Sequence, residues 1–329
     1  MTLTGEQLSV CLLTFDHAAI VESTLDSVLR QTLPGYELII SDDSSSDGTW
    51  EIVSRWAARH PHVVALRTPR NLGMAGNANF ALQHCARPYL ALLHHDDVYR
   101  SDLLEKWLGV ARRHPDVGFV FNAYADEHGR PIGDRFAWER LDGHEFLERH
   151  LLPRWGCPVR GTALISRRHL DALGGLREEF DLLADVDLWM RLSARAPVGY
   201  VDEPLICVRQ QRPQYYPAAY QGRSWSWRRQ RYLYELHARN RVEHYGLEST
   251  RGRLESLAFR TRLSLETAKW LSYALVRRRW PMIESAHESS TAHDQAWLRL
   301  YREGVRRYAP QWLAWPERAE PGRRLGDEP

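Results

Sequence analysis

The sequence has few cysteines and no dense cysteine pattern. Its four cysteines are spread along 329 residues, and no two of them form a Cys-x-x-Cys pair. Zinc sites and the disulfide frameworks of small secreted domains need closely spaced cysteines, so the sequence predicts neither. We expect Cys11, Cys85, Cys157 and Cys207 to be buried thiols.

Long apolar runs are also missing. No segment approaches the ~20 apolar residues that a membrane-spanning helix needs, and the opening residues MTLTGEQLSVCLLTFD lack the features of a secretion signal. The chain is 43% hydrophobic and 26% charged, as soluble globular proteins are. We therefore predict a cytoplasmic protein.

Charge is unevenly distributed along the chain. Residues 1–212 carry 23 basic and 29 acidic side chains, a balance of −6, whereas residues 213–329 carry 21 and 13, a balance of +8. The basic part also holds seven tryptophans, a composition that suits peripheral contact with the inner face of a membrane or, more simply, a solvated helical surface. No recognition motif for nucleic acid is present, and no nucleic-acid partner is expected.

Apolar runs alternate with amphipathic segments over the first hundred residues. Runs that suit buried strands open the segments 8–15, 36–49, 62–68 and 88–95, and the segments between them suit helices. This alternation is typical of a parallel, doubly wound sheet, whose ligands bind beyond the carboxyl ends of the strands.

The domain organisation follows from the same patterns. We predict one α/β domain over 1–212, a Pro-rich linker over 212–222 and a basic, Trp-rich helical extension over 213–329, with a helix at 264–280 and a disordered tail at 320–329.

Two adjacent carboxylates follow the fourth predicted strand. The stretch LLHHDDVY places Asp96 and Asp97 directly after His94 and His95. Paired carboxylates suit Mg²⁺ or Mn²⁺, and a neighbouring imidazole suits Mn²⁺. A solvated turn with packed histidines is the alternative.

A second acidic pair, Asp42 and Asp43, ends the second predicted strand in IISDDSSSDGT. These carboxylates offer acceptors to a base or a ribose, followed by a turn with outward backbone N–H groups. The simpler interpretation is a polar loop in which Asp47 or Thr49 caps the next helix.

A third acidic group lies in FDLLADVDLWMRL, near a predicted helix start, where the helix dipole favours negative charge. We expect Asp187 to cap this helix. Asp185, held near the same sheet edge, could accept a proton from a substrate hydroxyl.

Together and in this order, these stretches resemble the inverting nucleotide-sugar glycosyltransferases of family 2, which have the GT-A fold. Five motifs match in register between about Ser9 and Arg212: LLTFD, DDSSSDGT, NLGMAGNAN, YLALLHHDD and DVDLWMRL. The resemblance implies a GT-A-type, doubly wound, mostly parallel sheet flanked by helices, with a nucleotide-sugar half at about 1–125 and an acceptor half at about 126–212.

The resemblance also implies roles for individual residues. Those that would bind the donor nucleotide are Thr14, Asp16, Asp42, Asp43, Gly73, Asn79 and Asp96. Among them, Asp42 would recognise the base and Asp43 would hold the ribose side. Asp97, with Asp96, would bind Mn²⁺ or Mg²⁺ against the donor diphosphate, and Asp185 would be the catalytic base.

The implied reaction moves a sugar from a nucleoside-diphosphate sugar, UDP- or dTDP-linked, to a hydroxyl of a glycan, lipid-linked or small-molecule acceptor. The product would belong to glycan or glycoconjugate biosynthesis. Processive synthesis is not expected, because the Q-x-x-R-W motif of polysaccharide synthases is not met and no membrane span is present.

The chain departs from the family pattern at three positions. His94 stands where the metal motif often has an acid, Ala184 stands where a glutamate often precedes the base, and Gln211 stands where a histidine can help the metal. A catalytically degenerate nucleotide-binding module is therefore one alternative. A nucleotidyltransferase is another, but the segment TFDHAAIVES lacks the Gly-rich, basic loop expected after its first strand.

Overall fold

The structure is a computed structural model that describes residues 4–153, 157–209, 222–246, 248–255, 257–258 and 261. Residues 1–257 form one compact unit and residues 258–329 another. The predicted linker at 212–222 lies almost wholly outside the described residues, and the helix at 264–280 and the tail at 320–329 lie entirely outside them. Cys11 and Cys85 are buried as predicted, whereas Cys157 and Cys207 are half-buried; all four are free thiols.

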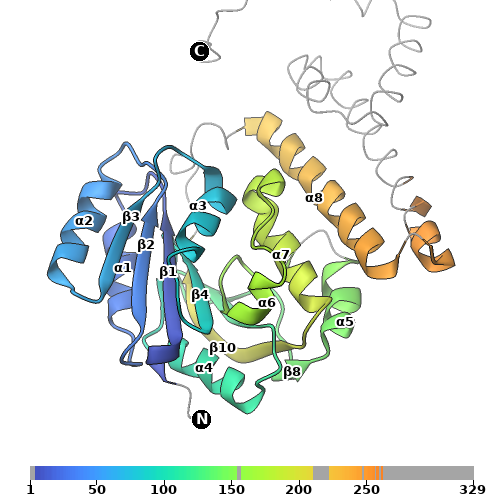
Figure 1. Cartoon of the computed structure of the whole chain (residues 1–329), viewed down its shortest axis with the longest axis horizontal. Helices are drawn as coiled ribbons and strands as arrows, with labels where there is room; N and C mark the ends of the chain where they lie inside the picture. Colours follow the sequence, from blue (N-terminus) through green and yellow to red (C-terminus); the bar gives the residue numbers. More distant parts are fainter. Residues whose placement is uncertain are drawn as a thin grey trace, which may run out of the picture. The chain divides into compact units, whose positions relative to one another are not determined.

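A ten-stranded sheet forms the centre of the first unit (Figure 1). Its main path has the order β3-β2-β1-β4-β9-β6-β10-β5, with β7 paired to β6 and β8 paired to β10. The strands are β1 Leu8–Thr14, β2 Glu37–Asp42, β3 Val63–Arg67, β4 Tyr89–His94, β5 Val98–Tyr99, β6 Phe119–Asp126, β7 Pro131–Ile132, β8 Arg140–Leu141, β9 Ala163–Ser166 and β10 Val198–Val208.

Strand direction confirms the predicted sheet. The first four strands are mutually parallel, and β6 and β10 are parallel to each other. Strand β9 is antiparallel to both β4 and β6, which makes the sheet mixed but mostly parallel. Every residue of β1 is buried, because helices cover both faces of the sheet and leave no polar side to its strands.

The helices lie between and around these strands. Those with an α-helical backbone are α1 Val21–Leu29, α2 Thr49–Arg59, α3 Gly73–Leu82, α4 Leu103–Arg113, α5 Gly143–Phe146, α6 Arg167–Asp171, α7 Ala184–Ser193 and α8 Gly222–Tyr245. Short helical turns of other types are η1 Gly5–Gln7, η2 Leu147–Leu151 and η3 Glu178–Leu183. Helices α1 and α2 lie on one side of the first strands and α3 on the other (Figure 1), as right-handed crossovers require.

Helix α1 begins later than its sequence pattern suggests. The backbone N–H groups of Ile20 and Val21 both donate to the carbonyl of His17, which closes a turn after β1 before the helix starts. From there Val21, Leu25 and Val28 are buried on one face, as their spacing predicts. The residues that follow β1 are thereby held at the edge of the sheet.

Helix α8 belongs to the same compact unit as the sheet. Leu236 is fully buried in the common core, and the Asn240 amide donates to the Asp187 carboxylate of α7 at 2.8 Å. Figure 1 shows α8 running beside α7. Within the described part of the chain, no helix is both long and apolar enough to span a membrane.

Candidate functional site

The sheet brings the predicted motifs to one edge. Leu13 of β1 pairs in register with Ser41 of β2 on one side and with His94 of β4 on the other. Because these strands are parallel, the segments that follow them emerge side by side. The acidic pairs after β2 and β4 therefore flank the residues after β1.

A cavity of about 230 Å³ opens at this edge. Its lining comes from the ends of β1 and β4, the loop after β2 and the start of α3: Leu13, Thr14, Phe15, His17, Asp43, Asn71, Gly73, Met74, Asn77, His94, His95, Asp96 and Leu182. Four of the residues predicted to bind the donor, Thr14, Asp43, Gly73 and Asp96, are in this lining. Asp16, Asp42, Asn79, Asp97 and Asp185 are not.

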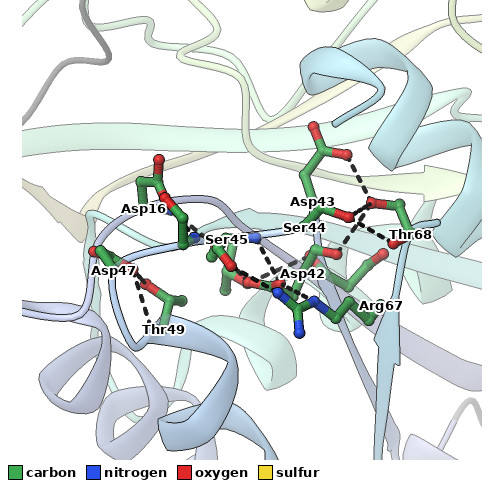
Figure 2. A network of polar contacts seen from close by, with 12 residues as sticks. Asp16, Asp42, Asp43, Ser44, Ser45, Asp47, Thr49, Arg67 and Thr68 are labelled. Carbon is green, nitrogen blue, oxygen red and sulfur yellow. Dashed lines mark hydrogen bonds and ion pairs between the residues drawn. The ribbon is translucent and has the colours of Figure 1, made fainter. Parts of the chain in front are cut away.

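Asp42 holds the loop after β2 together. Asp42 is fully buried. Its carboxylate accepts hydrogen bonds from the Ser45 hydroxyl at 2.5 Å, the Ser45 N–H at 3.0 Å and the Thr14 hydroxyl at 3.3 Å. The Arg67 guanidinium lies 3.6 Å away (Figure 2). These contacts are those of a structural carboxylate, and the base contact predicted for Asp42 stays a prediction.

Asp43 is the carboxylate of this pair that faces the cavity. Its Oδ1 accepts from the Leu72 N–H at 2.8 Å. It also accepts from the Thr68 hydroxyl at 3.0 Å (Figure 2), and the two bonds fix the side chain. Burial raises the pKa of Asp43, and these hydrogen bonds oppose the rise. The result is an oriented acidic group at the wall of the cavity.

The other aspartates around β1 and β2 fasten the two loops to each other. Asp16, in a left-handed conformation with φ of 45°, accepts from the Ser46 N–H at 2.8 Å. Asp47 accepts from the Ala18 N–H at 2.8 Å and the Thr49 N–H at 3.0 Å. The N-cap of α2 is Gly48, so neither Asp47 nor Thr49 caps the helix as the sequence suggested. Asp47 instead ties the first residue of α2 to the loop after β1.

Helix α3 begins with a glycine that its backbone requires. Gly73 has a φ of +76°, a conformation that costs other residues free energy, and it lines the cavity. Asn79 lies further along α3, where its amide donates to the Leu176 carbonyl at 3.0 Å and accepts from the Leu176 N–H at 2.9 Å. The structure therefore does not bring Asn79 to the cavity; Asn77 is there instead.

The turn that carries Asp96 and Asp97 is fastened from two elements. The Thr24 hydroxyl of α1 lies 2.7 Å from the His95 carbonyl and 2.8 Å from the Asp97 carbonyl, so it can donate to either. The Arg209 guanidinium donates to the Asp96 carbonyl at 2.6 Å and to the Thr24 hydroxyl at 2.6 Å. This support fixes the backbone of the turn that carries the two carboxylates.

The two carboxylates of the turn have opposite electrostatic environments. Burial and the charge of Asp96 raise the pKa of Asp97 well above its usual value. Burial also acts to raise the pKa of Asp96, but the neighbouring His95, His94 and His17 outweigh it and lower the pKa. A cation beside the pair would stabilise both ionised carboxylates, so this donor chemistry fits a divalent metal.

The metal site is not complete within the described residues, where no group of three or more His, Cys, Asp or Glu side chains is arranged to hold an ion. In such a site Asp96 and Asp97 would supply protein oxygens, and donor oxygens and water would fill the remaining positions.

Asp185 lies in the first turn of α7 with 9% of its surface exposed. Burial raises its pKa, and the nearby His94 limits the rise. That interaction connects Asp185 with the residue that begins the HHDD turn. A buried carboxylate with a raised pKa is a suitable proton acceptor near neutral pH.

Asp187 does not cap α7, contrary to our expectation. The helix begins at Ala184, and Asp187 is a fully buried member of its first turn. Its carboxylate accepts from Arg191 at 2.7 Å, Asn240 at 2.8 Å and Arg177 at 3.2 Å. Asp187 therefore connects α7 to the preceding loop and to α8, a long-range role that local capping patterns do not reveal.

Sequence reasoning missed three residues at this edge: His17 in the cavity lining and the supporting Thr24 and Arg209. His17 could have been found from the parallel pairing of β1 with β4, since that pairing sets the residues after both strands next to each other. The contacts of Thr24 and Arg209 join residues 71 to 185 positions apart, and no local pattern marks them.

Comparisons with known proteins agree with this arrangement. The model of the family described as "Glycosyl transferase family 2" matches residues 9–174. The putative teichuronic acid biosynthesis glycosyltransferase TuaG of Bacillus subtilis is 32% identical over 186 residues, covering 55% of this chain and 69% of that protein.

Solved structures show the same fold. S. aureus TarS 1–349 in complex with UDP-GlcNAc superimposes with a TM-score of 0.60 at 14% identity, over 93% of this chain and 82% of that one. The mannosyltransferase PcManGT of Pyrobaculum calidifontis, in complex with GDP-Man and Mn²⁺, superimposes with a TM-score of 0.54 at 20% identity, over 92% and 81%. With the family match over half the chain, the protein belongs to glycosyl transferase family 2 and is a glycosyltransferase with the GT-A fold.

Proposed function

We propose that this glycosyltransferase is metal-dependent, inverts the anomeric configuration, and transfers one sugar at a time from a nucleoside-diphosphate sugar to an acceptor hydroxyl in glycan or glycoconjugate biosynthesis. The observation that carries the proposal is the shared sheet edge, where Asp43 after β2 and Asp96 after β4 line one cavity. The similarity to a putative teichuronic acid biosynthesis glycosyltransferase, and to structures in complex with UDP-GlcNAc or GDP-Man, supports it.

The nucleotide is proposed to lie in the cavity with its base near Asp43. We assign the base contact to Asp43 rather than Asp42, because Asp43 lines the cavity while Asp42 is fully buried and bonded to Ser45 and Thr14. A carboxylate in this position accepts the N3–H of uracil or thymine, which favours a UDP- or dTDP-linked donor.

The diphosphate is proposed to lie next to Asp96 and Asp97. A divalent cation, Mn²⁺ or Mg²⁺, would supply positive charge there when bound. Thr24 and Arg209 keep the turn in one conformation, so the carboxylates are oriented before the donor arrives.

Asp185 is proposed to accept the proton of the acceptor hydroxyl. As the hydroxyl oxygen forms a bond to the anomeric carbon, the bond from that carbon to the diphosphate breaks and the nucleoside diphosphate leaves with the electron pair. Attack from the face opposite the leaving group inverts the configuration. The acceptor is proposed to be a glycan, a lipid-linked sugar or a small molecule bound by residues 126–212, with the donor held mainly by 1–125.

A thermal-shift panel of UDP, dTDP, GDP, CDP and ADP, each with and without Mn²⁺, tests donor binding, because a ligand that binds only the folded state raises the melting temperature. We expect a metal-dependent shift with UDP or dTDP. Asp97→Ala should abolish the metal dependence while retaining the fold. An equal shift with and without metal in the wild-type protein would contradict the metal assignment, and no shift with any nucleotide would favour a degenerate member of the fold.

A further inference from the structure

A second cavity, larger than the donor cavity at Asp43 and Asp96, lies between α4 and β10. It has a volume of about 640 Å³, within the range of about 300–1,000 Å³ that is usual for small-molecule sites. Its walls are one face of α4, the segment 136–139 that leads to β8, and residues 200–203 of β10 (Figure 1). Among the described residues that line it, none also lines the donor cavity.

An irregularity in β10 turns two carboxylates towards this cavity. The register of β10 with β6 shifts between Val201 and Pro204. Successive residues of a regular strand face opposite sides of the sheet, whereas the neighbours Asp202 and Glu203 both line the cavity. Such bulges are typical of places where a strand redirects a side chain towards a site.

Aromatic rings form the apolar part of the cavity wall. The Trp138 ring centroid lies 4.9 Å from that of Phe136 and 5.4 Å from that of Tyr200, and all three residues line the cavity. Phe136 and Tyr200 are buried, whereas Trp138 is half-buried and has surface left to contact a ligand. The face of an aromatic ring is negative, so it attracts the C–H groups of a sugar ring, which carry a small positive charge.

Ion pairs orient the polar part of the wall. The Lys106 ammonium lies 2.5 Å from the Glu203 carboxylate, and the Arg113 guanidinium donates to both oxygens of Glu139 at 2.8 Å. These cations lower the pKa of Glu139 and of Glu203, so both side chains are ionised at neutral pH and accept hydrogen bonds. A ligand with hydroxyl groups therefore meets oriented donors and acceptors next to the aromatic rings.

The charges around the cavity balance one another. Five carboxylates line it: Asp102, Glu105, Glu139, Asp202 and Glu203. Three cations line it, and two more pair with its carboxylates from outside the lining: Lys106, Arg112 and Arg113, then Arg100 and Arg135. A balanced site does not attract an anionic ligand, and aromatic faces combined with hydrogen-bonding groups suit a neutral carbohydrate.

Two walls of the cavity lead to the HHDD turn. Asp102, which lines the cavity, is five positions after Asp97, so their Cα atoms lie at most about 18 Å apart. Strand β10 runs from the cavity to Val208, and the Arg209 guanidinium that follows donates to the Asp96 carbonyl at 2.6 Å. A ligand of several sugar units is long enough to extend from the cavity to the donor site.

We propose that this cavity is a second carbohydrate site, which binds a neutral segment of the acceptor glycan away from the sugar that receives the transfer. The inference rests on the proposed function, and it selects a glycan from the acceptors considered there. Trp138 stacks on a sugar ring, and Asp202 and Glu203 accept hydrogen bonds from its hydroxyl groups.

Binding of oligosaccharides to the full-length protein, without donor, tests the site directly. The probes are three neutral hexamers, maltohexaose, cellohexaose and chitohexaose, and the anionic hexagalacturonic acid, each titrated by calorimetry and followed by saturation-transfer NMR. We expect at least one neutral hexamer to bind, and more tightly than the anionic one. Trp138→Ala should weaken this binding about tenfold or more, as truncation of an aromatic residue at the centre of a binding site does.

A second variant fills the cavity without removing an aromatic ring. Gly109 lies on α4 and lines the cavity, and among the described residues the nearest atom to a Cβ added there is Nη1 of Arg113, at 3.5 Å. Gly109→Trp should therefore fold and lose oligosaccharide binding. Trp56→Ala and Ala58→Trp are the matched controls, because Trp56 is half-buried and Ala58 is exposed on α2, outside the cavity.

The two controls should bind the hexamer as the wild type does, and thermal melting checks that every variant folds. Three results would each overturn the proposal: no binding of any neutral hexamer, tighter binding of the anionic hexamer than of every neutral one, or unchanged binding in folded Gly109→Trp.

Sugar transfer separates this inference from the proposed function. With the donor found by the nucleotide panel, KM should be lower for the hexamer that binds than for its disaccharide, and Trp138→Ala should raise KM for the hexamer about tenfold without lowering kcat. Transfer with equal KM for both lengths would overturn the role of the cavity and leave the transferase assignment standing. Hexamer binding that depends on Trp138, in a protein that transfers no sugar, would overturn the proposed function and leave the carbohydrate site standing.

Discussion

The two aspartates of DVDLWMRL should respond in opposite ways to the same substitution. Asp187 is fully buried and accepts hydrogen bonds from Arg191, Asn240 and Arg177 at 2.7, 2.8 and 3.2 Å. The Arg191 side chain is itself only 4% exposed. Asp187→Asn removes the negative charge and leaves a buried guanidinium without its counter-charge.

The size of the effect follows from this burial. Removing one partner of a buried ion pair typically costs about 3–5 kcal/mol, a large part of the 5–15 kcal/mol by which a domain is stable. For a unit of this size each kcal/mol lowers the melting temperature by about 2–4 °C. Asp187→Asn should therefore lower it by roughly 6–20 °C, because the buried Arg191 guanidinium loses its counter-charge.

Asp185→Asn is the matched control two residues away. Burial raises the pKa of Asp185, which means that folding disfavours its ionised form, so a neutral amide should leave the stability unchanged or slightly higher. Differential scanning calorimetry of both variants at pH 7.5 measures the contrast. Equal destabilisation by the two substitutions, or a stable Asp187→Asn, would refute the roles given to these carboxylates.

Three further changes test other parts of the structure. Burial lowers the pKa of His237 to about 4 from an unfolded value near 6.5. The neutral side chain therefore contributes fully to stability above about pH 6.5, and this contribution is lost as the pH falls towards 4. Between pH 7.5 and 5, the free energy of unfolding in urea should change by about 2 kcal/mol less in His237→Gln than in the wild type. Gly73→Ala should lower the free energy of unfolding by about 1 kcal/mol, because φ is +76° there, and should also weaken nucleotide binding measured by calorimetry. Gly129→Ala, at a φ of +73° in an exposed turn, should lower the free energy of unfolding equally and leave nucleotide binding unchanged. Thr24→Val should weaken metal-dependent nucleotide binding measured by thermal shift, because it removes the contacts to the HHDD turn, while Thr32→Val, whose hydroxyl bonds the Ser101 carbonyl at 3.2 Å, should not.

The sheet could be predicted from the sequence because its strands are buried on both faces. Strand β1 is buried along its whole length and mostly apolar, and the alternation of such runs with amphipathic segments leaves few topologies. The start of α1 could not be predicted, since the turn that delays it depends on two hydrogen bonds to the His17 carbonyl. The packing of α8 against α7 also had no local signal, because it depends on Asn240 meeting Asp187 across 53 positions.

The sequence predicted the location of the site more completely than the residues that form it. Acidic residues after β2 and β4 had to meet at one edge once the strands were parallel. Which carboxylate of a pair faces the cavity depends on side-chain contacts, and these turn Asp42 towards Ser45 and Asp43 towards the cavity. The presence of the His17 ring in the cavity lining depends on side-chain orientation, which residue spacing does not determine.

The most direct test of the account is the configuration of the product. With the donor identified by the nucleotide panel, NMR follows the sugar transferred by wild-type protein and by Asp185→Asn. We predict that an α-linked donor yields a β-linked product, and that Asp185→Asn lowers the rate by ~10²–10⁴-fold without weakening nucleotide binding. A product that keeps the donor's configuration, or a variant that transfers at the full rate, would contradict the central claim.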